Sequence, residues 1–172
     1  MIRPILTYPD PELKKKSDPL SAINDATRKL ARDMAETMYN APGVGLAAPQ
    51  IGVHQRVIVI DTSSRDEPKN LIVAINPEII YSEGEICEEE GCLSVSNYAA
   101  NVRRHTKVIV KGLNLDGAET TWHAEGLLAI AFQHEIDHLD GILFVDHLSP
   151  LKRELLQRKV RKAAEARTMG EQ

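Results

Sequence analysis

The sequence has no long apolar run. Its longest ones, such as 57–60 and 108–110, are far shorter than the roughly 20 residues that a membrane-spanning helix needs. We therefore expect no membrane partner. The segment 1–9 contains neither the apolar stretch nor the small-residue cleavage site of a signal peptide, so the sequence predicts a cytoplasmic protein.

Cysteine is scarce as well, since the chain contains only Cys87 and Cys92. Proteins of a reducing compartment rarely form disulfides, so a bond between the two is the weaker interpretation. A cysteine thiolate that binds a metal ion is then the more interesting hypothesis. Taken alone, however, a cysteine such as Cys92 is more often a small buried side chain than a ligand.

Positive charge is in deficit over the whole chain but not at its end. The formal net charge of −4 disfavours a general nucleic-acid binder, and we expect no DNA partner. The segment 151–172 carries seven basic and three acidic side chains, a net charge of +4 that leaves −8 for the rest. A basic helix of this kind can bind an anionic partner such as RNA, although a solvated helix face is the plainer interpretation.

The apolar patterns predict an α+β fold in one domain, 1–172, with mostly antiparallel sheets around a central buried helix. Helices are expected from Asn24 or Asp25 to about Tyr39, at 126–139, and over the basic segment from about 150 to 172. Strands are expected at 56–61, 71–75 and 78–81, with a hairpin formed by 102–113 and 119–123. The segment 1–20 is predicted to be an irregular arm, and 43–52 a tight loop.

The sharpest local signal is His134-Glu135-Ile136-Asp137-His138 in the apolar segment 126–139. Positions four residues apart lie on one face of a helix, so both imidazoles can bind one metal ion while Glu135 reaches a nearby water molecule. Polar groups in such an apolar helix are costly unless they are ligated or paired. The alternative is a cluster of these side chains on the protein surface.

A catalytic metal of this class has three protein ligands and one open position, so a third ligand is needed, which can be an Asp, Glu, His or Cys elsewhere in the chain. The segment Glu88-Glu-Glu-Gly-Cys-Leu-Ser94 stands out, because the glycine before Cys92 permits close backbone approach. Three consecutive glutamates are unusual inside a strand, and we expect at least one of them to have a fixed partner.

The loop Gly43-Val-Gly-Leu-Ala-Ala-Pro-Gln50 is a third candidate element. It has no third glycine at the dinucleotide-binding spacing and no following Lys-Ser/Thr, so it matches neither the dinucleotide-binding pattern nor that of a phosphate loop. Gln50, at the end of an apolar loop, is a buried donor that requires a partner. A developing oxyanion is one such partner.

Together, Gly43-Val-Gly-Leu-Ala-Ala-Pro-Gln50, Glu90-Gly-Cys-Leu-Ser94 and Gln133-His-Glu-Ile-Asp-His138 resemble the three signature motifs of the peptide deformylases. They occur in the family's order, and the similarity covers nearly the whole chain. The resemblance implies a bacterial-type metal-dependent hydrolase that removes the N-formyl group from the N-terminal methionine of newly synthesised polypeptides and releases formate.

The resemblance also implies the roles of individual residues. The implied metal ligands are Cys92, His134 and His138. Glu135 would take a proton from the attacking water and pass it to the leaving amine, while Gln50 and the backbone N–H of Leu93 would hold the oxyanion. The family resemblance implies Fe(II) in the cell, with Zn, Ni or Co able to replace it; sulfur and imidazole ligands suit Fe(II) or Zn.

Further positions match the substrate pocket and the groups that support the ligands. Glu90 and Gln133 are implied to orient ligands or fix the backbone. The methionine side chain is implied to lie against Val44, Gly45, Leu127, Ile130 and Ala131. The implied partners are N-formylmethionyl nascent peptides and, through the basic C-terminal helix, the ribosome.

The sequence departs from the family pattern after Ser94. Ser96 stands where many members have proline, and Ala99 where they have an arginine that helps to hold the peptide. We therefore expect an altered substrate preference beyond methionine rather than a loss of catalysis. Tyr98 or Arg103 could supply the missing contact.

Two other functions remain open from the residues alone. A metallopeptidase that cuts internal peptide bonds would share the His134–His138 helix but would not require Cys92 or Gln50. A non-catalytic module with a structural metal would be expected to have a fourth protein ligand. Cys87 and the remaining histidines are expected to be structural or on the surface: His54, His105, His123 and His147.

Overall fold

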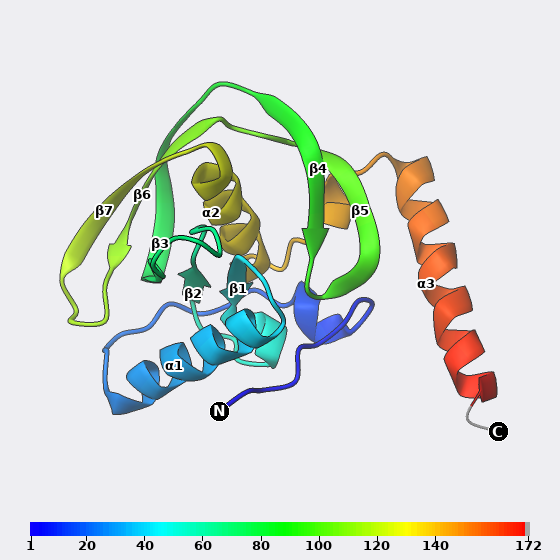
Figure 1. Ribbon diagram of the computed structural model, residues 1–172, viewed down its shortest axis with the longest axis horizontal. Coiled ribbons are helices and arrows are strands. Elements are labelled where there is room, and N and C mark those ends of the chain that lie inside the picture. Colours follow the sequence, from blue (N-terminus) through cyan, green and yellow to red (C-terminus); the bar gives the residue numbers. More distant parts are fainter. Residues whose placement is uncertain (171–172) are drawn as a thin grey trace.

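The computed structural model describes residues 1–170, which form an α+β fold with two antiparallel sheets (Figure 1). The larger sheet has the order β1 (Gly45–Ala47), β2 (Val57–Ile60), β3 (Ile72–Glu83), β6 (Lys107–Leu113) and β7 (Glu119–Glu125). The smaller sheet pairs β4 (Ile86–Cys92) with β5 (Val95–Arg104). The helices are α1 (Asp25–Asn40), α2 (Gly126–Leu139) and α3 (Pro150–Gly170). The predicted fold class is confirmed.

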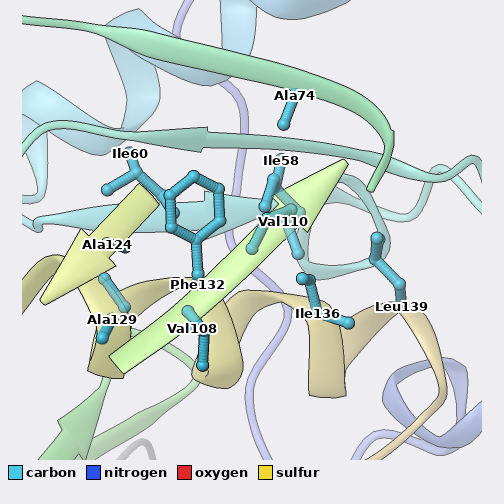
Figure 2. Close-up of a cluster of buried hydrophobic side chains, with 12 residues drawn as sticks. Ile58, Ile60, Ala74, Val108, Val110, Ala124, Ala129, Phe132, Ile136 and Leu139 are labelled. Atoms are coloured by element: carbon cyan, nitrogen blue, oxygen red, sulfur yellow. The ribbon is translucent and has the colours of Figure 1, made fainter. Parts of the chain in front are cut away.

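Helix α2 lies at the centre of the molecule (Figure 1) and packs on the larger sheet (Figure 2). Its Phe132 is fully buried among branched side chains of β2 and β6, including Ile58 and Val110. Burial of each large apolar side chain contributes about 1.5–3 kcal/mol. This packing explains why the segment is so apolar, and it fixes the helix that carries the two histidines.

Strand β2 lies between α2 and α1 and packs against both helices, because both of its faces are buried. Successive side chains of a strand point to opposite faces. Ile58 and Ile60 accordingly join the cluster around α2, whereas Val57 and Val59 join the cluster under α1. The α1 side of that second cluster consists of Leu30, Met34 and Met38.

A third apolar cluster holds the smaller sheet and the base of α3. Leu13, from the short 3-10 helix Pro11–Lys14, and Phe144, from the 3-10 helix Phe144–His147, pack there with Val102 of β5. Leu156 joins this cluster and the half-buried Val160 packs against it, whereas the C-terminal part of α3 extends away from the body of the protein (Figure 1). The helix predicted from about 150 is thus present; its expected last positions, 171 and 172, lie outside the described residues.

Several predicted strand boundaries are wrong. The strands expected at 71–75 and 78–81 form one strand, β3, which passes Asn76-Pro77 through a register irregularity with Asn76 at φ 50°. The strand expected at 102–113 is two strands, since β5 ends at Arg104 and β6 begins at Lys107 in the other sheet. Part of the predicted loop 43–52 is strand β1 followed by the 3-10 helix Ala48–Ile51.

Strand β4 is not among the predicted strands, because its Glu88-Glu-Glu90 run has low strand propensity. Its pairing with β5 and the contacts of Glu90 outweigh that propensity. None of the helices in residues 1–170 is long and apolar enough to cross a bilayer.

Candidate metal centre and active site

Three potential ligand atoms converge where the end of β4 meets α2. The Sγ of Cys92 lies 3.3 Å from Nε2 of His138, and the Nε2 atoms of His138 and His134 lie 3.2 Å apart. All three donor atoms lie within 4.8 Å of one another, and the described residues contain no other group of this kind. Tetrahedral metal bonds of about 2.0–2.3 Å separate neighbouring ligands by about 3.3–3.7 Å. The residues therefore fit a bound metal ion.

The electrostatics of the cluster also fit a cation. Burial lowers the pKa of His138 well below its ordinary value, which favours the neutral imidazole that binds metals. Burial acts in the same direction on His134, but hydrogen bonds with Cys92 and Glu90 and the charge of Glu135 outweigh it and raise the pKa of His134. Two carboxylates, those of Glu90 and Glu135, therefore lie beside His134.

Glu135 lies beside the ligands without being one of them. Its Oε1 is 4.0 Å from Nε2 of His134, and its buried Oε2 has no hydrogen-bond partner within residues 1–170. A Cβ atom at Gly45 would lie 2.6 Å from Oε1, so only glycine lets β1 approach this carboxylate. Burial raises the pKa of Glu135 to about 7. Such a carboxylate can accept and release a proton near neutral pH.

The side chain of Gln50 is buried and held from two sides. Its Oε1 accepts a hydrogen bond from the N–H of Ala47 at 2.9 Å, and its Nε2 donates to Oγ of Ser94 at 3.0 Å. The same Nε2 lies 3.6 Å from Sγ of Cys92. The donor is therefore directed toward the ligand cluster. Ser94 belongs to a recognised motif, but its contact with Gln50 joins two segments distant in the sequence and could not be predicted.

Glu90 has the fixed partners expected for at least one of the three consecutive glutamates 88–90. Its Oε1 accepts from Nδ1 of His134 at 2.9 Å, and both carboxylate oxygens accept from Arg104 at 2.8 and 3.0 Å. Burial would raise the pKa of Glu90, but the hydrogen bonds from His134 and Arg104 outweigh it and lower the pKa to about 2. The Glu90 carboxylate is therefore ionised at neutral pH, accepts the hydrogen bond from Nδ1 of His134 and so orients the His134 ring.

Gln133 holds the connection between β5 and β6. Its Oε1 accepts from the N–H of His105 at 2.8 Å, and its Nε2 donates to the carbonyl oxygens of His105 and Ala129, both at 2.9 Å. Asp137, one turn further along α2, accepts from Arg104 at 2.7 Å. Sequence reasoning assigned no role to Arg104 or Asp137, since nothing local indicates their pairing.

A cavity of about 580 Å³ opens in front of these groups. The residues expected to contact methionine all line it: Val44, Gly45, Leu127, Ile130 and Ala131. Gln50, Cys92, Leu93, His134 and Glu135 line it too. Val44 and Leu127 are 46% and 54% exposed, so apolar surface is available to a ligand at the cavity mouth.

The other cysteine and histidines lie outside the cluster. Cys87 is an exposed free cysteine. His54 contacts Glu12 at 2.6 Å, and His147 contacts Asp137 at 2.8 Å. None of them belongs to the group of potential metal ligands found in the described part of the chain.

Comparisons with known proteins agree with this geometry. The family described as polypeptide deformylase matches residues 2–154. A peptide deformylase of Thermodesulfovibrio yellowstonii is 58% identical over 155 residues, which is 90% of this chain and 94% of that protein. The crystal structure of a peptide deformylase from Legionella pneumophila is 48% identical and superposes with a TM-score of 0.90 over 98% of both chains.

A second crystal structure, of peptide deformylase from Ehrlichia chaffeensis, is 35% identical, with a TM-score of 0.92 over 98% of this chain and 99% of that one. The resemblance inferred from the three motifs is thereby confirmed over nearly the full length. The chain belongs to the polypeptide deformylase family, enzymes that remove the formyl group from polypeptides.

Proposed function

We propose that this chain hydrolyses the N-formyl group of nascent polypeptides that begin with formylmethionine and releases formate, using a divalent metal held by Cys92, His134 and His138. The observation that carries the proposal is the convergence of these three donor atoms beside the buried carboxylate of Glu135, where Cys92, His134 and Glu135 line one cavity. The proposed location is the bacterial cytoplasm, where such polypeptides are synthesised.

The donor set bears on the identity of the metal. A soft thiolate with two imidazoles suits Fe(II) or Zn, and we propose Fe(II) as the native ion, with Zn, Ni or Co as replacements. Once bound, the metal supplies Lewis acidity, which lowers the pKa of water from 15.7 toward about 7 and polarises a carbonyl group.

The protein's own residues perform the proton transfers and hold the developing charge. Glu135 accepts the proton of the attacking water and gives it to the leaving amine, a contribution of about 10²- to 10⁴-fold. Nε2 of Gln50 and the backbone N–H of Leu93 donate to the oxyanion, where loss of one donor costs about 3–4 kcal/mol. Glu90 keeps Nδ1 of His134 protonated, so that Nε2 remains free to bind the metal.

The substrate lies in the 580 Å³ cavity with its methionine side chain against Val44, Leu127 and Ile130. Ala99 and Tyr98 also line the cavity, whereas no lysine or arginine of residues 1–170 does. We therefore retain the proposal that preference beyond methionine is altered. The variant Ala99→Arg is expected to change KM and selectivity among formylated peptides, and unchanged values would contradict it.

The exposed basic side chains of α3 are the proposed contact with the ribosome. Replacing Lys159, Arg161 and Lys162 by glutamine should weaken co-sedimentation with ribosomes while activity on short peptides stays within about twofold. These side chains lie outside the cavity lining. Equal co-sedimentation of the variant and the parent protein would refute this part of the proposal.

Two substrates separate the proposed function from its alternatives. Purified protein loaded with Fe(II) under anaerobic conditions is offered a formyl-Met peptide and, separately, unformylated casein. The proposal predicts formate release from the first and no cleavage of the second. Cleavage of casein would indicate a metallopeptidase, and inactivity on both would indicate a module with a structural metal.

A further inference from the structure

Arg104 is a buried charge that lies between the smaller sheet and α2. Its side chain is 5% exposed. Nε and Nη2 donate to the two oxygens of Glu90 on β4, and Nη1 donates to Oδ2 of Asp137 on α2 at 2.7 Å. A buried charge is costly unless it is well paired, so the guanidinium is confined to the position between its two carboxylates. Arg104 is neither a potential ligand nor part of the cavity wall.

One of these contacts leads directly to a ligand. Oε1 of Glu90 accepts from Nη2 of Arg104 at 3.0 Å and from Nδ1 of His134 at 2.9 Å. Two parallel N–H bonds from a planar guanidinium fix the plane of a carboxylate, whereas a single bond does not. The orientation of the Glu90 carboxylate, and with it the direction of the His134 ring, therefore depends on Arg104.

The second contact acts on the helix. Asp137 follows His134 by three residues on α2, and its Oδ2 also contacts Nε2 of His147 at 2.8 Å. Beside Arg104, the side chain of Gln133 bonds both backbone groups of His105. The end of β5 is thus tied to α2 at two neighbouring points.

These ties matter because the proposed ligands come from two different elements. Cys92 ends β4, whereas both histidines lie on α2. Whatever sets the position of the β4–β5 sheet relative to α2 also sets the distance from Sγ to the imidazole nitrogens. Among the described residues, Arg104 is the side chain that pairs with a carboxylate on each of these two elements.

We propose that Arg104 is a positioning residue for the metal centre, which locks Glu90 of β4 against Asp137 of α2 and so directs Nε2 of His134 toward Cys92 and His138. This inference rests on the proposed function, since it concerns the same metal site. It predicts that Arg104 affects metal affinity although it contacts neither metal nor substrate.

The test compares Arg104→Gln with Arg103→Gln. Arg103 is the adjacent arginine on β5, is 81% exposed and forms a 3.5 Å ion pair with the exposed Glu85, so it is a matched control. Metal-free proteins are titrated with Co(II) in competition with a chromophoric chelator, and the visible spectrum of the bound Co(II) is recorded. We expect Arg104→Gln to bind Co(II) about 10- to 100-fold more weakly with an altered spectrum. Arg103→Gln should stay within twofold of the parent.

A second variant keeps the inference testable if Arg104→Gln does not fold. Arg104→Lys keeps the charge but cannot form the fork that reaches both carboxylates. We expect it to fold and still to bind Co(II) about tenfold more weakly. Parent-like affinity and spectrum in a folded Arg104 variant would overturn the inference.

A double-mutant cycle with Glu90→Gln examines the route of the effect. If Arg104 acts through Glu90, the double variant should lose no more Co(II) affinity than the single variant with the larger loss. Free-energy losses that add in the double variant would overturn this route. The proposed function fails separately: a parent protein that binds no Co(II), or binds it equally well after Cys92→Ala, would refute the metal site itself.

Discussion

Helices α2 and α3 both carry several ionisable side chains, but they hold them in opposite ways. In α2, His134, Glu135 and His138 are buried, and Asp137 is paired with Arg104. In α3, only Leu156 is buried, and the ion pair Arg158–Glu154 is exposed. Charges in water contribute little to stability, whereas buried charges persist only where partners or ligands hold them. The two helices thus differ in where their charges lie: α2 carries the proposed metal ligands and Glu135 inside the core, whereas α3 presents its charges to solvent.

The largest effect should follow removal of the buried carboxylate on α2. Glu135→Gln keeps the shape of the side chain but cannot take up a proton, so kcat should fall about 10²- to 10⁴-fold. Formate release is measured together with metal content, which should remain unchanged. Glu165→Gln, on the exposed surface of α3, is the control and should retain full activity. A Glu135→Gln variant with the parent's kcat would contradict the proposed role of Glu135 in proton transfer.

The next effect concerns stability at acid pH. The pKa of Glu90 is lowered from 4.5 to about 2, so its ionised form stabilises the folded state above pH 4.5 and that contribution is lost as the pH falls toward 2. The shift corresponds to about 3 kcal/mol. Urea unfolding of metal-free protein between pH 5 and 2 should show this loss.

Two variants test the source of the acid sensitivity. Glu90→Gln should be less stable at neutral pH and should lose much less stability on acidification than the parent. Glu154→Gln, on α3, should follow the parent curve, because an exposed ion pair contributes at most about 1 kcal/mol. Identical curves for the parent and Glu90→Gln would contradict the account of the buried pair.

The smallest effect distinguishes two neighbouring leucines of α3. Leu156 packs into the cluster with Leu13 and Phe144, whereas Leu155 is 48% exposed. Leu156→Ala should cost about 2 kcal/mol of unfolding free energy, the lower end of the range for buried leucine. Leu155→Ala should change it by less than about 0.5 kcal/mol. Equal costs would mean that α3 packs on the protein with a different face.

The same contrast explains what the sequence could predict. Helix α2 and its histidine pair follow from a local period and an unusually apolar composition, and α1 follows from its cap at Asn24 and its apolar spacing. The three motifs together identified the family. Strand β4 could not be predicted from its own residues, because its glutamates favour a strand only once Glu90 pairs with Arg104 and His134.

The contacts that support the site could not be predicted from the sequence either. Arg104 pairs with Asp137 across 33 residues, and Gln50 reaches Ser94 across 44. No local pattern specifies such partners, since the fold brings them together. The motif residues themselves, Gln50, Glu90 and Gln133, were recognised in the sequence, but their partners required the structure.

The central claim is that Cys92, His134 and His138 hold one catalytic metal ion. Its most direct test is elemental analysis of anaerobically purified parent and Cys92→Ala proteins, with formate release measured on the same samples. The account predicts about one divalent ion per chain and full activity in the parent, and loss of both in the variant. A Cys92→Ala protein that keeps its metal and its activity would contradict it.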